Sequence, residues 1–181
     1  MLIISFQGFS QSFYHAGGVG LSSIIYHQTY KTAFVDADES GSTGIPGFVY
    51  NPFLSFDVNR KTAFNIAAYP MLGFNLNSRS GGSLGFELPV VGELFFGDVT
   101  DAGGFAGLGF AFGAAADEYW SGSILGPQLS GGAQFEVQQN LVKLRAAFTI
   151  GLNKEGNTPD ITYSKDSRNM LSLQLLYLFG Q

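Results

Sequence analysis

The sequence predicts an all-β fold, an eight-stranded antiparallel up-and-down transmembrane β-barrel. In the last segment, residues 171–179, large apolar or aromatic groups occupy every second position, which is the period of a strand with one apolar face. The 181 residues include 25 glycines, which interrupt nearly every apolar stretch and would each weaken a helix by about 1 kcal/mol. No apolar run reaches the ~18 residues of a spanning helix, so this chain could cross a membrane only as a closed barrel.

Eight alternating segments can be counted from residue 12 onward. The first, residues 13–30, has the weakest pattern because its glycines and serines leave both faces without large groups. The other seven each place large apolar side chains on one face, and these faces fall within residues 48–56, 64–74, 84–96, 106–112, 129–137, 142–152 and 171–179. An even number of antiparallel strands brings both chain ends to the same side of the membrane.

The charged residues inside these segments all fall on the face opposite the large apolar groups. A lipid-facing Lys or Arg costs about 2 to 4 kcal/mol at the membrane midplane, and a buried charge is tolerated only when it is paired or solvated. Eight strands enclose little more than their own side chains, so we predict a filled polar lumen with an internal ion-pair network. Its predicted members are Glu87, Glu93, Glu136, Lys143 and Arg145.

The connections between segments are expected to alternate in length. Long connections are predicted on one side at residues 31–44, 75–83, 115–127 and 153–169, and short ones on the other side at 57–62 and 138–140. The connection at 97–103 is longer than a turn on that side usually is. Three prolines, Pro52, Pro70 and Pro89, fall inside segments, where each removes a backbone donor. We expect a bulge or distorted pairing at these positions.

Over about residues 12 to 181, and with Tyr177-x-Phe179 as its terminal motif, the chain resembles the small eight-stranded outer-membrane barrels of bacteria, of the OmpA transmembrane-domain and OmpX type. The resemblance implies a bacterial outer-membrane location, contact with lipid and lipopolysaccharide, and a monomer. It also implies a non-enzymatic structural or adhesion-like role, in which extracellular loops meet an unknown partner. In that family the barrel-assembly machinery reads the terminal strand, and the matching residues here are Leu171, Leu173, Leu175, Tyr177 and Phe179.

The N-terminal segment is expected to lie outside the barrel. Residues 1–11 are apolar and place small residues, Gly8 and Ser10, before Gln11, as at a signal-peptidase site. We interpret residues 1–11 as the remnant of an export signal or a disordered N-terminus, and residues 12–181 as the barrel.

Two other functions remain open from the sequence. The first is an outer-membrane lipid-modifying enzyme of the lipid A acyl hydrolase type, in which His27 would activate Ser22 or Ser23. No His-x-Ser pair occurs and the chain has no cysteine, so we predict no catalytic residues. The second is a soluble lipocalin-like barrel with its apolar faces turned inward to bind an apolar ligand. A nucleic-acid partner is excluded because the net charge is -5 and no basic stripe exists.

A weak calcium candidate lies at Asp36, Asp38 and Ser40, spaced like the first half of a calcium-binding loop. Gly47 stands where the bidentate acid of such a loop belongs, so we favour a solvated acidic loop, with no metal and no cofactor. Four aromatic residues are predicted to anchor the barrel at the membrane interface, where amphipathic rings are favoured. They are Tyr26, Tyr30, Tyr119 and Trp120.

Overall fold

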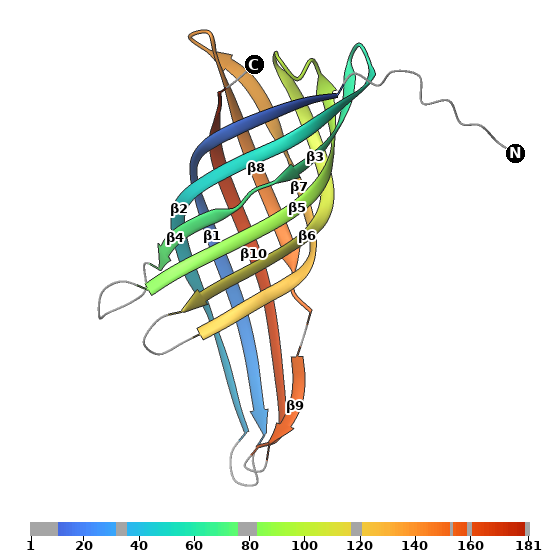
Figure 1. Ribbon diagram of the computed structural model, residues 1–181. Coiled ribbons are helices and arrows are strands. Elements are labelled where there is room, and N and C mark those ends of the chain that lie inside the picture. Colours follow the sequence, from blue (N-terminus) through green and yellow to red (C-terminus); the bar gives the residue numbers. More distant parts are fainter. Residues whose placement is uncertain are drawn as a thin grey trace, which may run out of the picture.

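The computed structural model describes residues 11–31, 36–75, 83–116, 121–152, 154–158 and 161–179. Every regular element in this part of the chain is a strand (Figure 1). The strands are β1 Gln11–Lys31, β2 Asp36–Asn59, β3 Thr62–Ala68, β4 Met71–Asn75, β5 Ser83–Gly97, β6 Gly103–Ala116, β7 Ser121–Val137, β8 Asn140–Ile150, β9 Lys154–Thr158 and β10 Ile161–Phe179. Within the described residues, no helix has the length and apolar character needed to cross a membrane.

The strands form one closed antiparallel ring. β3 and β4 both pair with β2 and β5, so they occupy one position in the ring, and β8 and β9 share another because both pair with β10. The ten strands therefore fill eight positions. β1 pairs with β2 on one side and with β10 on the other, which closes the barrel and confirms the predicted fold.

Side chains alternate strictly between the inside of the ring and its outer surface. The large apolar groups of the predicted segments point outward, and Phe48 and Leu108 expose 72% and 70% of their surface. The membrane-spanning part of this outer belt carries no Asp, Glu, Lys or Arg among the described residues. Such a continuous apolar belt is stable in lipid and not in water. The lipocalin-like alternative is wrong, because it requires the apolar faces to point inward.

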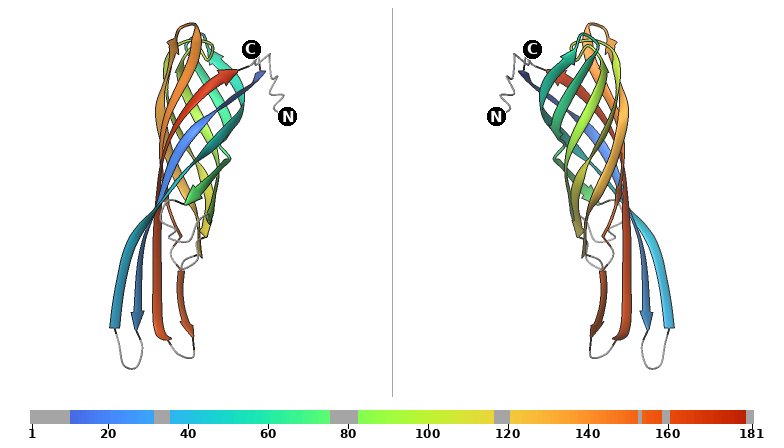
Figure 2. Two further views of the ribbon diagram at one scale, coloured as in Figure 1. Left: turned by 90° about the vertical axis from the view of Figure 1, so that its left-hand side faces the viewer. Right: turned by 90° about the vertical axis from the view of Figure 1, so that its right-hand side faces the viewer.

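Three strands are much longer than a membrane requires. β1, β2 and β10 have 21, 24 and 19 residues, whereas about 9 to 11 residues span a bilayer. Together with β9 they project beyond the rest of the wall, at the end opposite the chain termini (Figure 2). Ile25 is the last apolar residue on the outer face of β1, and its partners on β2 and β10 are the polar residues Ser42 and Asn169. We call the part beyond this level the extension, and the opposite end of the barrel, where Gln11 and Phe179 lie, the terminal end.

The extension corrects the predicted long loops at residues 31–44 and 153–169. Most of these residues are strand, and the register between β1 and β2 runs without interruption from Gln11 to Lys31. Their Gly, Ser and Asp content suggests a loop, yet neighbouring strands satisfy the backbone donors and acceptors. In the extension, pairing with neighbouring strands therefore outweighs the local preference of these residues for a loop.

Pro70 and Pro89 explain why one strand of the ring is divided into β3 and β4. Tyr50 N donates to Pro70 O at 3.0 Å and Tyr69 N donates to Pro89 O at 3.0 Å, but neither proline can return a hydrogen bond. The register of this strand against β2 is the same on both sides of the interruption. The predicted distortion is thus a local break at residues 69–70, without a bulge.

Pro52 removes a third backbone donor in the same region. In the register of β2 and β3 it lies opposite Ala68, whose carbonyl it cannot reach with an N–H. The side-chain amide of Asn51 donates to Ala68 O at 2.9 Å instead. A buried side chain thereby replaces the missing ladder bond.

Candidate functional site

The barrel interior contains a charged centre between two apolar layers. Toward the terminal end lie Phe53, Phe95 and Phe105, of which the last two are cross-strand partners. Toward the extension, the inward side chains are again apolar and fully buried, and they include Ile24, Ile45, Ile124 and Met170. Charges placed between such layers are removed from water, so each one needs a partner inside the barrel.

Glu93 of β5 is the acceptor at the centre of this buried group. Lys143 Nζ of β8 donates to Glu93 Oε2 at 2.9 Å, and Tyr69 OH donates to Glu93 Oε1 at 2.5 Å. Lys143 Nζ also donates to Tyr69 OH at 2.5 Å, and Arg145 Nε lies 3.9 Å from Glu93 Oε1. The carboxylate is therefore neutralised by two cations within the lumen.

Aromatic rings surround the two cations. Lys143 Nζ lies 4.2 Å from the ring centre of Phe105, 5.1 Å from that of Tyr69 and 5.4 Å from that of Phe53. Arg145 Cζ lies 4.0 Å above Tyr69. These distances are those of cation–π interactions, which compensate part of the lost hydration.

Glu87, also on β5, is held differently. It accepts hydrogen bonds from the hydroxyls of Ser22 and Ser172 and a long one, 3.5 Å, from Gln128 Nε2. Among the described residues no cation lies within 4.0 Å of it. Arg145 donates to Gln128 Oε1 at 2.6 Å, so Gln128 connects Glu87 to the charged centre.

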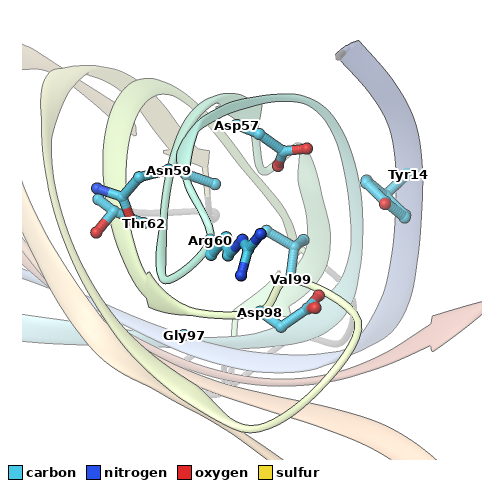
Figure 3. Close-up of a pocket in the computed structure, with 9 residues that line it drawn as sticks. Tyr14, Asp57, Asn59, Arg60, Thr62, Gly97, Asp98 and Val99 are labelled. Carbon is cyan, nitrogen blue, oxygen red and sulfur yellow. The ribbon is translucent and has the colours of Figure 1, made fainter. Parts of the chain in front are cut away.

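A pocket of about 510 Å³ opens at the terminal end, between the β2–β3 and β5–β6 turns (Figure 3). Tyr14 and Val99 contribute apolar surface to it, and the other lining side chains are mainly polar. The guanidinium of Arg60 lies in the middle of the pocket in Figure 3, with Asp57 on one side and Asp98 on the other.

Hydrogen bonds hold both turns of this pocket in place. Gly97 N donates to Lys61 O at 3.0 Å and so ties one turn to the other. Gln134 Nε2 donates to the carbonyls of Val99 and Asp101 at 2.7 and 2.8 Å. Asp98 Oδ1 accepts from the backbone N and the hydroxyl of Thr100, and these bonds lower the pKa of the Asp98 carboxyl.

No protein-family model and no curated protein sequence matches this chain. Among solved structures it is similar to the outer membrane protein OprG from Pseudomonas aeruginosa, with a TM-score of 0.58 and 11% identity, over 96% of this chain and 98% of that one. The outer membrane protein AlkL is similar with a TM-score of 0.51 and 13% identity, over 96% and 93%. The fold is that of a small outer-membrane β-barrel. At these identities the likeness concerns the fold alone.

The outer-membrane fold gives the two ends of the barrel their direction. In such barrels short turns and both termini face the periplasm, and the longer connections face outside. The terminal end with its pocket is therefore periplasmic, and the extension is extracellular. Between them, the apolar belt lies in the bacterial outer membrane, in an environment of lipid and lipopolysaccharide.

The structure brings together four of the five residues predicted for the lumen network. Glu93, Lys143 and Arg145 are in direct contact, and Glu87 joins them through Gln128. Glu136 does not belong to this buried group, which corrects its predicted place. It lies one residue before the end of β7, where water reaches its exposed carboxylate.

The sequence pattern did not identify the serine residues that donate hydrogen bonds to Glu87. Ser22 and Ser172 were not expected in the lumen, although both lie opposite the apolar face of their strands. The same alternation that placed Glu87 inside could have identified them.

The residues considered for lipid hydrolysis lie on different faces of β1. Ser22 points into the lumen toward Glu87, whereas His27 is exposed on the outer face. Ser23 shares the outer face with His27, but four residues of extended strand separate them by about 13 Å. Activation of a serine requires a hydrogen bond of about 3 Å to the base. The described residues hold no such His–Ser pair.

The calcium candidate lies in a strand, which corrects the expected acidic loop. Asp36, Asp38 and Ser40 occupy successive outward positions of β2, about 7 Å apart along the strand. Oxygens on an extended strand do not converge around one ion as those of a turn do. Asp36 instead lies 3.9 Å from Lys31, its cross-strand partner.

Tyr26 and Tyr30 do not lie on the lipid-facing side of β1, where the predicted membrane-interface anchors would be expected. Both lie in the extension, on the face that continues the lumen side of β1 beyond Ile24. Tyr30 OH donates to Gln28, and partial burial, followed by the nearby Glu39 and Asp166 carboxylates, raises the pKa of Tyr30. The other two predicted anchors, Tyr119 and Trp120, lie outside the described residues.

The terminal-strand residues occupy the outer face of β10. Leu171, Leu173, Leu175, Tyr177 and Phe179 are all exposed there. The Phe179 ring lies 5.0 Å from that of His15 across the β1–β10 seam. Their recognition by the barrel-assembly machinery remains a prediction.

Proposed function

We propose that this protein is a non-enzymatic outer-membrane barrel with a closed interior that acts at the cell surface through its extracellular extension. The observation that carries the proposal is the division of the molecule into a filled barrel and a water-exposed sheet. The filled interior offers no transport path, and the sheet is the part that a partner outside the cell can reach.

The contacts inside the barrel support a closed interior. Lys143, Arg145 and Tyr69 fill the centre of the lumen, Phe95 belongs to the apolar layer toward the terminal end, and all four are at most 2% exposed. An eight-stranded barrel has just enough room for such side chains. A hydrated ion would have to displace paired charges and then pass the apolar layer toward the extension.

The composition of the extension supports an interaction surface. Its outer face continues from Ser42 to Ser40, Asp38 and Asp36, whereas its other face carries Tyr30 beside polar and charged groups. Antiparallel pairing makes this a defined surface, since β1 and β2 are paired residue for residue up to Lys31 and Asp36. Tyrosines together with adaptable polar groups are common at binding surfaces.

The test removes the extension and keeps the barrel. Ile25 and Ser42 are cross-strand partners, as are Ile150 and Asn169, so an Asn-Gly turn can replace residues 26–41 and residues 151–168. Bacteria displaying the full chain should adhere to epithelial cells and to plates coated with matrix glycoproteins, and bacteria with the shortened chain should not. The proposal would be contradicted if bacteria with the full and the shortened chain adhered equally at equal surface expression. It would also be contradicted if bacteria with the full chain adhered no more than empty-vector cells.

The closed and non-enzymatic interior has its own test. Purified protein in planar bilayers should give no steady channels, and incubation with lipopolysaccharide or phospholipid should release no fatty acid. Steady conductance of porin size would contradict the closed interior. Acyl release that disappears in His27→Ala would contradict the absence of enzymatic activity.

A further inference from the structure

The periplasmic pocket has the size and surface of a ligand site. Its volume of about 510 Å³ lies within the range of about 300 to 1,000 Å³ that small-molecule sites occupy. Tyr14 stacks on Phe53 with 5.2 Å between ring centres, and Val99 is buried, so one side of the pocket is apolar. The opposite side carries the charges of Asp57, Arg60 and Asp98.

These three charges do not neutralise one another. No ion pair within 4.0 Å joins Arg60 to Asp57 or Asp98, although all three belong to the described residues and line one pocket. Asp98 uses one carboxylate oxygen, Oδ1, for the turn and keeps Oδ2 available. Figure 3 shows the order acid, guanidinium, acid across the pocket.

Hydrogen bonds also hold the backbone of both turns in place, which favours binding. The hydrogen bond from Gly97 N to Lys61 O links the two turns, and Gln134 holds the β5–β6 turn from the barrel wall. A ligand therefore meets two turns whose backbone is already ordered and whose charged side chains are accessible.

We infer that this pocket binds a diamino acid group, which carries one carboxylate and two ammonium charges. Arg60 matches the carboxylate, because a guanidinium binds carboxylates through two parallel hydrogen bonds. Asp57 and Asp98 match the two ammonium groups, and the methylene chain between them packs on Tyr14 and Val99. The pocket charge of -1, from two acids and one arginine, complements the +1 charge of such a ligand.

Ligands of other charge patterns fit less well. A polyanion would meet two carboxylates, and a simple diamine would leave Arg60 without a partner beside two bound cations. An amino acid with a neutral side chain would leave one of the two acids unused. The presence of both signs of charge in the pocket thus favours a ligand that carries both.

The experiment titrates the full chain in detergent micelles with L-lysine, cadaverine and L-glutamate at low ionic strength, where exposed charges are least screened. Amide NMR signals of the two turns report binding. L-lysine should bind saturably, and cadaverine and L-glutamate should bind at least about tenfold more weakly. Equal affinities for L-lysine and cadaverine, or no saturable binding of L-lysine, would overturn the inference.

Substitutions of the charged pocket residues test which group of the ligand each residue binds. Arg60→Gln should weaken L-lysine about tenfold and leave cadaverine unaffected or tighter, whereas Asp57→Asn should weaken both. Lys61→Gln is the matched control, because it removes a neighbouring charge whose side chain does not line the pocket. If Lys61→Gln lowers the affinity for L-lysine as much as Arg60→Gln does, the effect is one of net charge and not of a carboxylate bound by Arg60. That result would overturn the inference. The heat-dependent gel shift of each variant verifies that the barrel is intact.

Discussion

Lys143 shows how one side chain depends on several strands at once. Its ammonium group, on β8, is satisfied by Glu93 of β5, by Tyr69 at the β3–β4 break, and by the ring of Phe105 on β6. These contacts tie together parts of the wall that are not all adjacent in the ring. An ion pair of this kind adds modest stability by itself, but removing one member leaves the other buried and uncompensated.

Replacing Lys143 should therefore destabilise the barrel strongly. Lys143→Met leaves Glu93 with Arg145 as its nearest cation, at 3.9 Å, and we expect a loss of about 3 to 5 kcal/mol. The measurement is urea unfolding in micelles. Lys61→Met, an exposed substitution of the same type, should change the unfolding free energy by less than about 0.5 kcal/mol.

The double variant Glu93→Gln/Lys143→Met distinguishes pairing from packing. If the charges are coupled, it should be more stable than the sum of the two single losses indicates. Strictly additive losses, or a midpoint of Lys143→Met equal to that of Lys61→Met, would show that the pair does not contribute to stability.

Asp98 lies outside the membrane-spanning part of the barrel and makes the stability of its turn depend on pH. Its pKa is lowered from the ordinary value of 3.8 by the side chain and then the backbone of Thr100. A carboxyl with a lowered folded pKa stabilises the folded state above its unfolded pKa, and this contribution is lost as the pH falls through the folded pKa. The Asp98 turn should therefore loosen only below about pH 4.

Thr100→Val tests this assignment by removing the hydroxyl donor. The pKa of Asp98, followed by carboxyl-carbon NMR, should rise toward 3.8. An unchanged Asp98 titration would mean that the hydroxyl bond does not form in solution.

At the scale of elements, the region of β2, β3, β4 and β5 shows how a sheet accommodates prolines. Pro52, Pro70 and Pro89 lie in adjoining strands of the ring, and the side chain of Asn51 replaces the donor missing at Pro52. Tyr69 lies at the break and still follows the inward alternation of residues 63–71, so its hydroxyl reaches Glu93. The sheet thus accommodates the prolines without changing which side chains face the lumen.

Asn51→Ala should weaken this region in particular. The carbonyl of Ala68 would lose its donor inside the barrel, at a cost of about 1 to 3 kcal/mol. Hydrogen exchange should accelerate at Tyr50 and Tyr69, while amides of the distant β6–β7 pair remain protected. Uniform acceleration over the barrel, or none, would contradict this role of Asn51.

At the scale of the whole molecule, closure of the ring determines how the protein unfolds. β1 pairs with β10 from His15–Phe179 to Lys31–Tyr163, so the ring has no free edge at the level of the membrane. Opening the barrel exposes backbone donors and acceptors of both strands at once. We expect unfolding to be cooperative and slow in detergent.

The folded barrel should therefore resist SDS at room temperature and change its gel mobility only after boiling. The comparison is one sample loaded with and without heating. A variant without residues 171–179 is the control, since it cannot close the ring and should migrate at one position. Identical mobility of the full chain in both lanes would argue against a closed barrel.

Sequence alone determined the barrel, because side-chain alternation in a strand is strict and every misplaced charge in the membrane is costly. That rule placed Glu87, Glu93, Lys143 and Arg145 on the inner face before any partner was known. It also placed Glu136 on the inner face, although the turn predicted at residues 138–140 puts Glu136 at the end of its strand, where water reaches it.

Only the tertiary structure decided the extension, the pairs inside the lumen and the periplasmic pocket. The Gly- and Ser-rich residues of the extension have weak local preference, and their backbone becomes strand through pairing with neighbours. Glu93 and Lys143 are 50 residues apart, and Asp57 and Asp98 meet only where two turns lie side by side. Such contacts depend on closure of the ring, which no local pattern encodes.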